Sequence, residues 1–61
     1  MEQLTIGTQV KEVKTGIIGV IVDKDPSCIY CIGVEWEDDE GSTWWYQKED
    51  LGKKIQVISM L

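Results

Sequence analysis

Cys28 and Cys31 form a C-x-x-C pair, a spacing that serves zinc sites and redox dithiols. A zinc site needs four ligands, and the chain has no histidine and no third cysteine, so only two chains together could complete one. A redox dithiol begins a helix in a βαβ unit, which the sequence does not predict. Residues three apart in an extended strand also lie too far apart for a disulfide. We therefore expect no metal and two ordinary thiols, buried or half-buried.

Carboxylates are concentrated between Glu35 and Glu40, where they could form a metal-binding loop. This run lacks the regularly spaced oxygen ligands of a calcium loop. It is typical of a solvated strand face that leads into a turn. The alternative is an acidic recognition surface for a basic partner.

The chain offers no recognisable set of catalytic groups. Without histidine it lacks the usual general base and triad partner. The Gly16-x-x-Gly19 segment lacks the lysine and the helix of a phosphate-binding loop. A domain of 61 residues also has little room for a substrate pocket, which usually needs about 300 Å³ or more. The sequence therefore predicts a protein that is not an enzyme and uses no cofactor.

Four of the five aromatic residues lie between Trp36 and Tyr46. Core packing is the expected role of Trp36, because so small a domain needs its large apolar residues for stability. Alternation along a strand puts Trp44 and Tyr46 on one face and Trp45 on the other. At least one of these rings should then face solvent, where it can anchor a partner. The candidate binding residues are Trp45, Glu35, Glu37, Trp44 and Tyr46.

Apolar residues recur with a period near two, as they do in half-buried strands. Ile32, Val34 and Trp36 show this alternation, and β-branched and aromatic residues are those that strands prefer. Turn signals at residues 25–28 and 38–41 separate the runs. The predicted elements are strands at 8–14, 17–24, 29–37, 42–47 and 53–58, with a 3₁₀ turn at 48–51 that points Leu51 inward.

In the segment from Thr15 to Asp23, Gly16 and Gly19 flank the entry to a run that is apolar on both faces of its strand. A strand that bends across two sheets of a barrel would bury both faces. Five short strands with tight turns predict a small barrel or sandwich, in which closure removes exposed edges. We expect one domain over residues 1–61, with a frayed end at 59–61.

The net charge of −5, with six lysines and no arginine, argues against a nucleic-acid partner. Nucleic-acid binding depends on cationic contacts with phosphate and often on bidentate arginine contacts. The longest uncharged apolar run, Thr15 to Val22, is too short to span a bilayer. No basic and apolar leader opens the sequence, so we expect a cytoplasmic location.

Several segments together carry a family resemblance: Ile6-Gly7-Thr8-Gln9-Val10, residues 15–23, Val34-Glu35-Trp36-Glu37-Asp38, Gly41-Ser42 and Lys48-Glu49-Asp50-Leu51. In these segments the chain resembles the SH3-like barrel superfamily, especially its KOW-type and Tudor-like branches and small proteins of bacteria and their phages. The resemblance implies an all-β, five-stranded SH3-like barrel with a 3₁₀ turn before the last strand. Members bind RNA, DNA, ribosomes, polymerase, proline-rich peptides or methylated side chains, so the fold does not select the ligand. The acidity and the missing arginine depart from the KOW-type RNA binders.

The leading functional hypothesis is a small non-enzymatic interaction module that binds a protein partner through an aromatic and acidic surface. Two alternatives are KOW-type binding to nucleic acid or ribosomes, and an acidic mimic that occupies the groove of a DNA- or RNA-binding protein. The last segment, 55–61, holds more apolar residues than one face needs. Open edges at the first and last strands could then support a weak homodimer. Because two chains of charge −5 repel, we expect a monomer at micromolar concentration.

Overall fold

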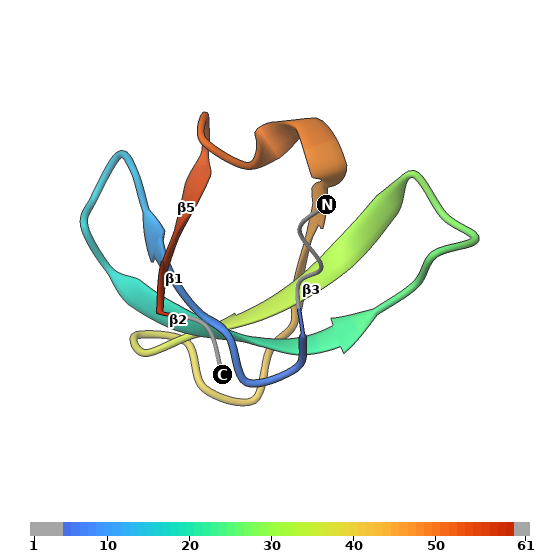
Figure 1. Cartoon of the computed structure of the whole chain (residues 1–61). Helices are drawn as coiled ribbons and strands as arrows, with labels where there is room; N and C mark the ends of the chain where they lie inside the picture. The colour runs from blue at the N-terminus through green and yellow to red at the C-terminus, as the bar shows by residue number, and fades with distance from the viewer. Residues whose placement is uncertain (1–4, 60–61) are drawn as a thin grey trace.

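A computed structural model describes residues 5–59 as five antiparallel strands in one strongly curled, half-barrel sheet (Figure 1). The elements are β1 (Gln9–Glu12), β2 (Ile18–Lys24), β3 (Tyr30–Trp36), β4 (Trp44–Gln47), the 3₁₀ turn η1 (Lys48–Asp50) and β5 (Ile55–Ser59). Within the described range there is no α-helix. The predicted all-β, five-stranded fold with a 3₁₀ turn before the last strand is confirmed.

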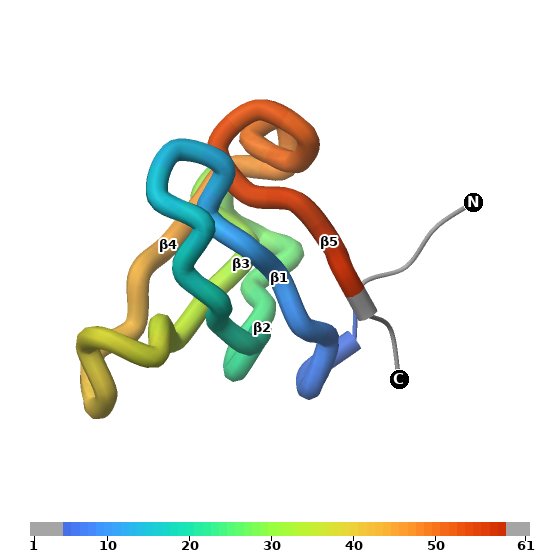
Figure 2. The backbone as a smooth tube through the Cα atoms, turned by 90° about the vertical axis from the view of Figure 1, so that its left-hand side faces the viewer, coloured from blue at the N-terminus to red at the C-terminus, as the bar shows by residue number. Residues whose placement is uncertain are grey.

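The strand order β4-β3-β2-β1-β5 makes β4 and β5 the two edges of the sheet. β5 returns from η1 to pair with β1, and Val10 lies opposite Val57. Figure 2 shows β5 running beside β1, with β4 at the other side of the sheet. The expectation that the first strand forms an edge is therefore wrong, because β1 is paired on both sides. Ser59 ends β5 opposite Gln9, whereas residues 60–61 of the expected frayed end lie outside the described range.

The core lies inside the curl of the sheet. Alternate residues of β1, β2, β3 and β5 supply it, as the period of two requires. Its buried apolar members are Val10, Ile21, Ile32, Val34, Trp36 and Ile55. Leu51 and Tyr46 are half-buried and pack against this cluster. The core position of Trp36 and the inward position of Leu51 agree with the expectation from the sequence.

β2 is fully buried on one face only. Gly19 and Ile21 are buried, whereas Ile18, Val20 and Val22 are half-buried on the other side of the strand. The expectation that this strand buries both faces is therefore wrong. The register shift that bends β2 falls after Ile21, but among residues 5–59 no second layer covers the outer face there.

β1 ends at Glu12, earlier than expected, because the turn begins at that residue. The Gly16 N–H donates to the Glu12 carbonyl oxygen at 2.7 Å, and the Thr15 hydroxyl donates to Glu12 Oε1 at 2.6 Å. Gly16 has a φ of 79°, in the left-handed region that glycine occupies without strain. Val13 consequently lies in the turn and is exposed.

The two turns that flank β3 form where the sequence predicts them. In the first, the Cys28 N–H donates to the Asp25 carbonyl oxygen at 3.2 Å, and the Ser27 hydroxyl donates to Asp25 Oδ1 at 2.7 Å. This side-chain bond from Ser27, with a further bond from the Ser27 N–H, lowers the pKa of Asp25. In the second turn, Gly41 adopts a φ of 90°.

No helix among residues 5–59 has the length and apolar character needed to cross a membrane.

Candidate binding surface

The pairing register brings half-exposed side chains together on the outer face of the sheet. Gln9 of β1 lies opposite Val20 of β2, and Val20 lies opposite Glu35 of β3. The neighbouring row of residues paired across the same three strands belongs to the inner face, because it contains the buried Val10 and Trp36. The row from Gln9 to Glu35 therefore faces away from the core.

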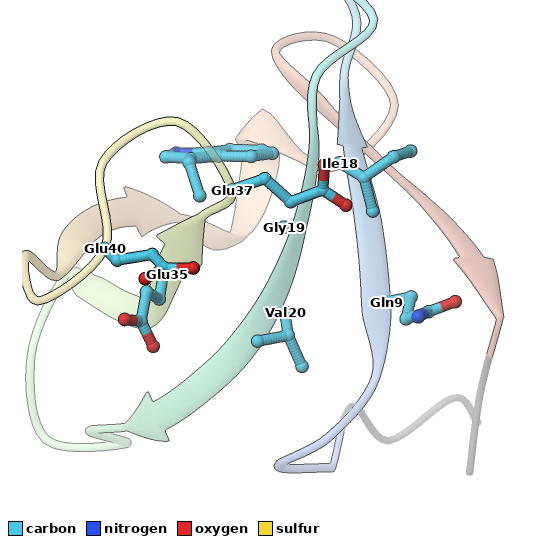
Figure 3. Close-up of a pocket in the computed structure, with 8 residues that line it drawn as sticks. Gln9, Ile18, Gly19, Val20, Glu35, Glu37 and Glu40 are labelled. Atoms are coloured by element: carbon cyan, nitrogen blue, oxygen red, sulfur yellow. The ribbon is translucent and has the colours of Figure 1, made fainter.

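A shallow groove of about 270 Å³ follows this row (Figure 3). Its aliphatic side chains come from β2, its indole from β3, and its carboxylates from β3 and the loop that follows. The residues that line it are Gln9, Ile18, Gly19, Val20, Glu35, Trp36, Glu37 and Glu40. The groove is open to solvent and smaller than the pockets of about 300–1,000 Å³ that enclose small molecules. Its size and shape suit one or two side chains of a larger partner.

Three glutamates make this groove acidic. Glu35 Oε2 accepts a hydrogen bond from the Gly41 N–H at 2.8 Å, which holds the loop of residues 37–43 against β3. That loop brings Glu40 to the groove. Glu37 and Glu40 are exposed, and neither carboxylate forms a hydrogen bond or ion pair with any of residues 5–59, although the Glu37 N–H donates to the Ile18 carbonyl oxygen at 3.0 Å. In Figure 3 the Glu37 side chain extends over β2 toward Ile18.

The groove can hold a cationic side chain by two kinds of contact. Ile18 and Val20 offer apolar surface to the aliphatic stem of a lysine or arginine. Glu37 and Glu40 offer unpaired carboxylates to the charged head, and such charge-assisted hydrogen bonds are stronger than neutral ones. One cation of the chain itself, Lys11, lies opposite Ile18 at the border of the groove. The carboxylates still outnumber it.

Trp45 lies on the same outer face as Glu35. It pairs with Gly33 of β3, and Gly33 and Glu35 are two positions apart on one strand and therefore share a face. The Trp45 indole covers Gly33 closely, since a Cβ at Gly33 would lie 3.2 Å from Trp45 Cη2 and 3.0 Å from Thr43 Cγ2. Trp45 nevertheless remains 40% exposed. This surface offers a partner an aromatic ring beside the acidic groove.

Trp44 and Tyr46 lie on the opposite face of β4. Trp44 is 51% exposed, and its Nε1–H donates to Asp39 Oδ2 at 3.0 Å. Tyr46 turns toward the core, where its hydroxyl accepts a hydrogen bond of 3.1 Å from Trp36 Nε1. The two rings meet edge to face, with centroids 6.1 Å apart. Burial is the main cause of the raised pKa of Tyr46.

The structure thus divides the five candidate binding residues into two groups. The outer surface around the groove holds Trp45, Glu35 and Glu37, and the two glutamates line the groove. Trp44 lies on the other side of the edge strand, and Tyr46 contacts the core.

Sequence reasoning did not single out Gln9, Ile18 or Val20 as binding residues. They join the groove only through the register of β1, β2 and β3, for which no local signal exists. Glu40 belongs to the acidic run whose alternative role is a recognition surface for a basic partner. A tight turn at Gly41 returns this run toward β3.

The two cysteines are free thiols in different surroundings. Cys31 is half-buried and packs against the core, whereas Cys28 is exposed. The expectation of a buried or half-buried thiol is wrong for Cys28, because this residue lies in the turn before β3 rather than in the strand. Within residues 5–59, no group of three or more Cys, Asp or Glu side chains is placed to hold a metal ion.

A second, more open hollow of about 430 Å³ lies at the far end of β4. Ile29, Gln47, Lys48 and Glu49 line it. Ile29 is 73% exposed, and the neighbouring Tyr30 is also exposed, so apolar surface surrounds this end of the edge strand.

Comparisons of the chain with protein-family models, with curated proteins and with solved structures find no significant match.

Proposed function

We propose that this chain is a small non-enzymatic binding module that recognises a basic segment of a protein partner. The observation that carries the proposal is the acidic groove with an exposed tryptophan on the same face. Glu37 and Glu40 present unpaired charge, and Trp45 presents apolar surface beside them. Exposed tryptophan is enriched among the residues that dominate binding at protein interfaces.

Charge supports a basic partner over a nucleic acid. The chain has a net charge of −5, and Glu35, Glu37 and Glu40 all line the groove. A phosphate backbone would meet repulsion there, whereas lysine and arginine side chains would be attracted and steered toward the groove.

We also propose that the domain is a relative of the SH3-like barrels. The five-stranded curled sheet and the 3₁₀ turn before β5 support this relationship. We further propose a cytoplasmic location, because a chain with two cysteines lacks the disulfide framework typical of small secreted domains.

Selection of short random peptides on the immobilised protein tests the proposed function. Peptides rich in lysine or arginine should be enriched, and a representative peptide should bind Glu37→Gln about tenfold more weakly, since a hydrogen bond to a charged group contributes about 1.5–3 kcal/mol. Glu12→Gln is the matched control, because it removes the same charge from a residue that lines neither hollow and keeps a side-chain oxygen that can accept the bond from the Thr15 hydroxyl. Equal losses in the two variants would reduce the effect to net charge and contradict a groove site.

Trp45→Ala tests the aromatic part of the surface. The variant should remain folded and bind the selected peptide about tenfold more weakly, as expected for an interface anchor. Circular dichroism and urea unfolding measure the first property, and peptide titration measures the second. If the variant unfolds, Trp45 belongs to the structural core and its assignment to the binding surface is wrong.

A further inference from the structure

β4 is an open edge of the sheet. Among residues 5–59 it pairs with β3 alone, and the strand order leaves its other side without a neighbour. An open edge presents backbone N–H and C=O groups to which another strand can add, and many proteins protect such edges with charged residues or proline. β4, with the sequence Trp-Trp-Tyr-Gln, contains neither. This edge therefore lacks a common defence against strand addition.

The two ends of β4 differ in chemistry. The acidic loop, here Asp38, Asp39 and Glu40, adjoins its first residue and is held there by the bond from Trp44 Nε1 to Asp39 Oδ2. The open hollow of about 430 Å³ adjoins its last residue, Gln47. An added strand would therefore meet negative charge at one end and apolar surface from Ile29 at the other.

We infer that the basic partner segment binds in an extended conformation and adds to β4 as a sixth strand. This inference rests on the proposed function, and it specifies the conformation and the sequence pattern of the ligand. Antiparallel pairing is slightly more stable per residue than parallel pairing, so the C-terminal half of the segment lies beside Trp44. Its basic residue then reaches the acidic loop and Glu40, which also lines the groove.

The length of β4 sets the spacing of the pattern. The strand has 4 residues and spans about 10–13 Å at the usual rise of about 3.3 Å per residue. An apolar residue of the partner that reaches the hollow therefore precedes the basic residue by about four positions. The Gln47 N–H already donates to Asp50 Oδ2 at 2.9 Å, so the edge available for pairing extends from Trp44 to Tyr46.

The side chains of β4 are placed to cover an added strand on both faces. Trp44 and Trp45 are exposed on opposite sides of the strand, and cross-strand contacts with aromatic residues stabilise a pair. The other edge is partly occupied, because the Ile55 carbonyl oxygen of β5 accepts a bond of 2.7 Å from the Gly52 N–H and Leu51 bridges to Ile55.

Amide hydrogen exchange with a designed peptide tests the inference. The peptide Gly-Ser-Ile-Thr-Val-Thr-Lys-Thr-Ser-Gly has the required order and spacing, and a control peptide has its isoleucine and lysine exchanged. With the first peptide, exchange should slow for those amides of residues 44–46 that point away from β3, and amides in residues 55–59 should not change. The control peptide should bind about tenfold more weakly, because it places lysine at the hollow and isoleucine at the acidic loop.

N-methylation of alternate amides of the peptide separates strand addition from side-chain recognition. This change removes backbone donors and retains every side chain, so it should weaken binding about tenfold or more if the peptide pairs with β4. Strand addition is refuted if N-methylation has no effect and the amides of residues 44–46 are not protected, or if neither peptide binds while basic peptides from the selection do. In that case, weaker binding of basic peptides to Glu37→Gln would still uphold the proposed function. If strand addition is refuted and Glu37→Gln also binds these peptides as tightly as the unmodified protein, both proposals are refuted.

Discussion

The contact between Gly19 and Trp36 leads to a specific prediction about Gly19→Ala. A Cβ at Gly19 would lie 2.5 Å from Cε3 and 2.9 Å from Cζ3 of the Trp36 indole, and 2.9 Å from the Glu35 carbonyl oxygen. Those distances are well below van der Waals contact, so atoms must move. The indole must shift, and the carbonyl can move only with the backbone of β3, which is paired with β2. Trp36 is only 6% exposed, which leaves little space for the shift.

The expected cost follows from three contributions. Overpacking of a core costs about 1–3 kcal/mol. Displacement of the indole also strains its hydrogen bond with Tyr46, whose net contribution is about 1 kcal/mol. Replacement of a strand glycine returns about 0.5–1 kcal/mol of conformational entropy. Gly19→Ala should therefore lower the free energy of unfolding by about 2 kcal/mol, a large part of the 3–5 kcal/mol or so that a core of this size supplies.

Urea unfolding, followed by tryptophan fluorescence, measures this change. Gly16→Ala is the control, because a Cβ there meets nothing within 4 Å and its cost of about 1 kcal/mol comes from the φ of 79° alone. Trp36→Phe removes the two clashing ring atoms. The double variant with Gly19→Ala should therefore lose about 1 kcal/mol less free energy of unfolding than the two single variants lose in sum. Additive effects, or an unchanged stability of Gly19→Ala, would refute close packing of Trp36 on β2.

Three further predictions concern Tyr46 and assembly. Tyr46→Phe leaves the Trp36 Nε1–H without its acceptor and should lower the free energy of unfolding by about 1–2 kcal/mol in urea; an unchanged value would contradict a structural role for this bond. Burial raises the pKa of Tyr46 above its ordinary 10.0, so the unfolded chain loses this proton at a lower pH than the folded chain. The stability that the protonated hydroxyl contributes is complete below pH 10 and is lost as the pH rises further. The free energy of unfolding should therefore fall less with rising pH in Tyr46→Phe. Sedimentation velocity should show a monomer at micromolar concentration, with any dimer favoured by added salt, because chains of charge −5 repel. A stable dimer at low salt would contradict that prediction.

Local patterns predict the strands of this fold but not all of their pairings. Alternation along Ile32, Val34 and Trp36 identifies β3 and its buried face, because side chains of a strand alternate between faces. The pairing of Val10 with Val57 has no such signal. Its two strands lie at opposite ends of the chain, and their contact depends on how far the intervening sheet curls.

The candidate site shows the same division between local and distant information. Alternation predicts that Trp44 and Trp45 point to opposite faces, and the structure agrees. That Tyr46 turns inward depends on the register of β4 with β3, which brings its hydroxyl within 3.1 Å of Trp36 Nε1. The sequence also cannot show that Glu35 bonds to the Gly41 N–H, and this contact decides where Glu40 lies.

The two tryptophans of the edge strand are exposed but held in position. Asp39 accepts a hydrogen bond from the Trp44 indole, and Gly33 provides a flat surface beneath Trp45. A side chain that is already ordered loses less conformational entropy when a partner binds, so each ring can contribute more of its contact energy to affinity. A domain of 61 residues would gain stability by burying these rings, yet Ile21, Ile55 and the rest of the core leave them outside. Ordered apolar surface at an open edge, beside carboxylates that no side chain of residues 5–59 pairs with, therefore supports the proposed binding of a partner rather than a role in the stability of the fold.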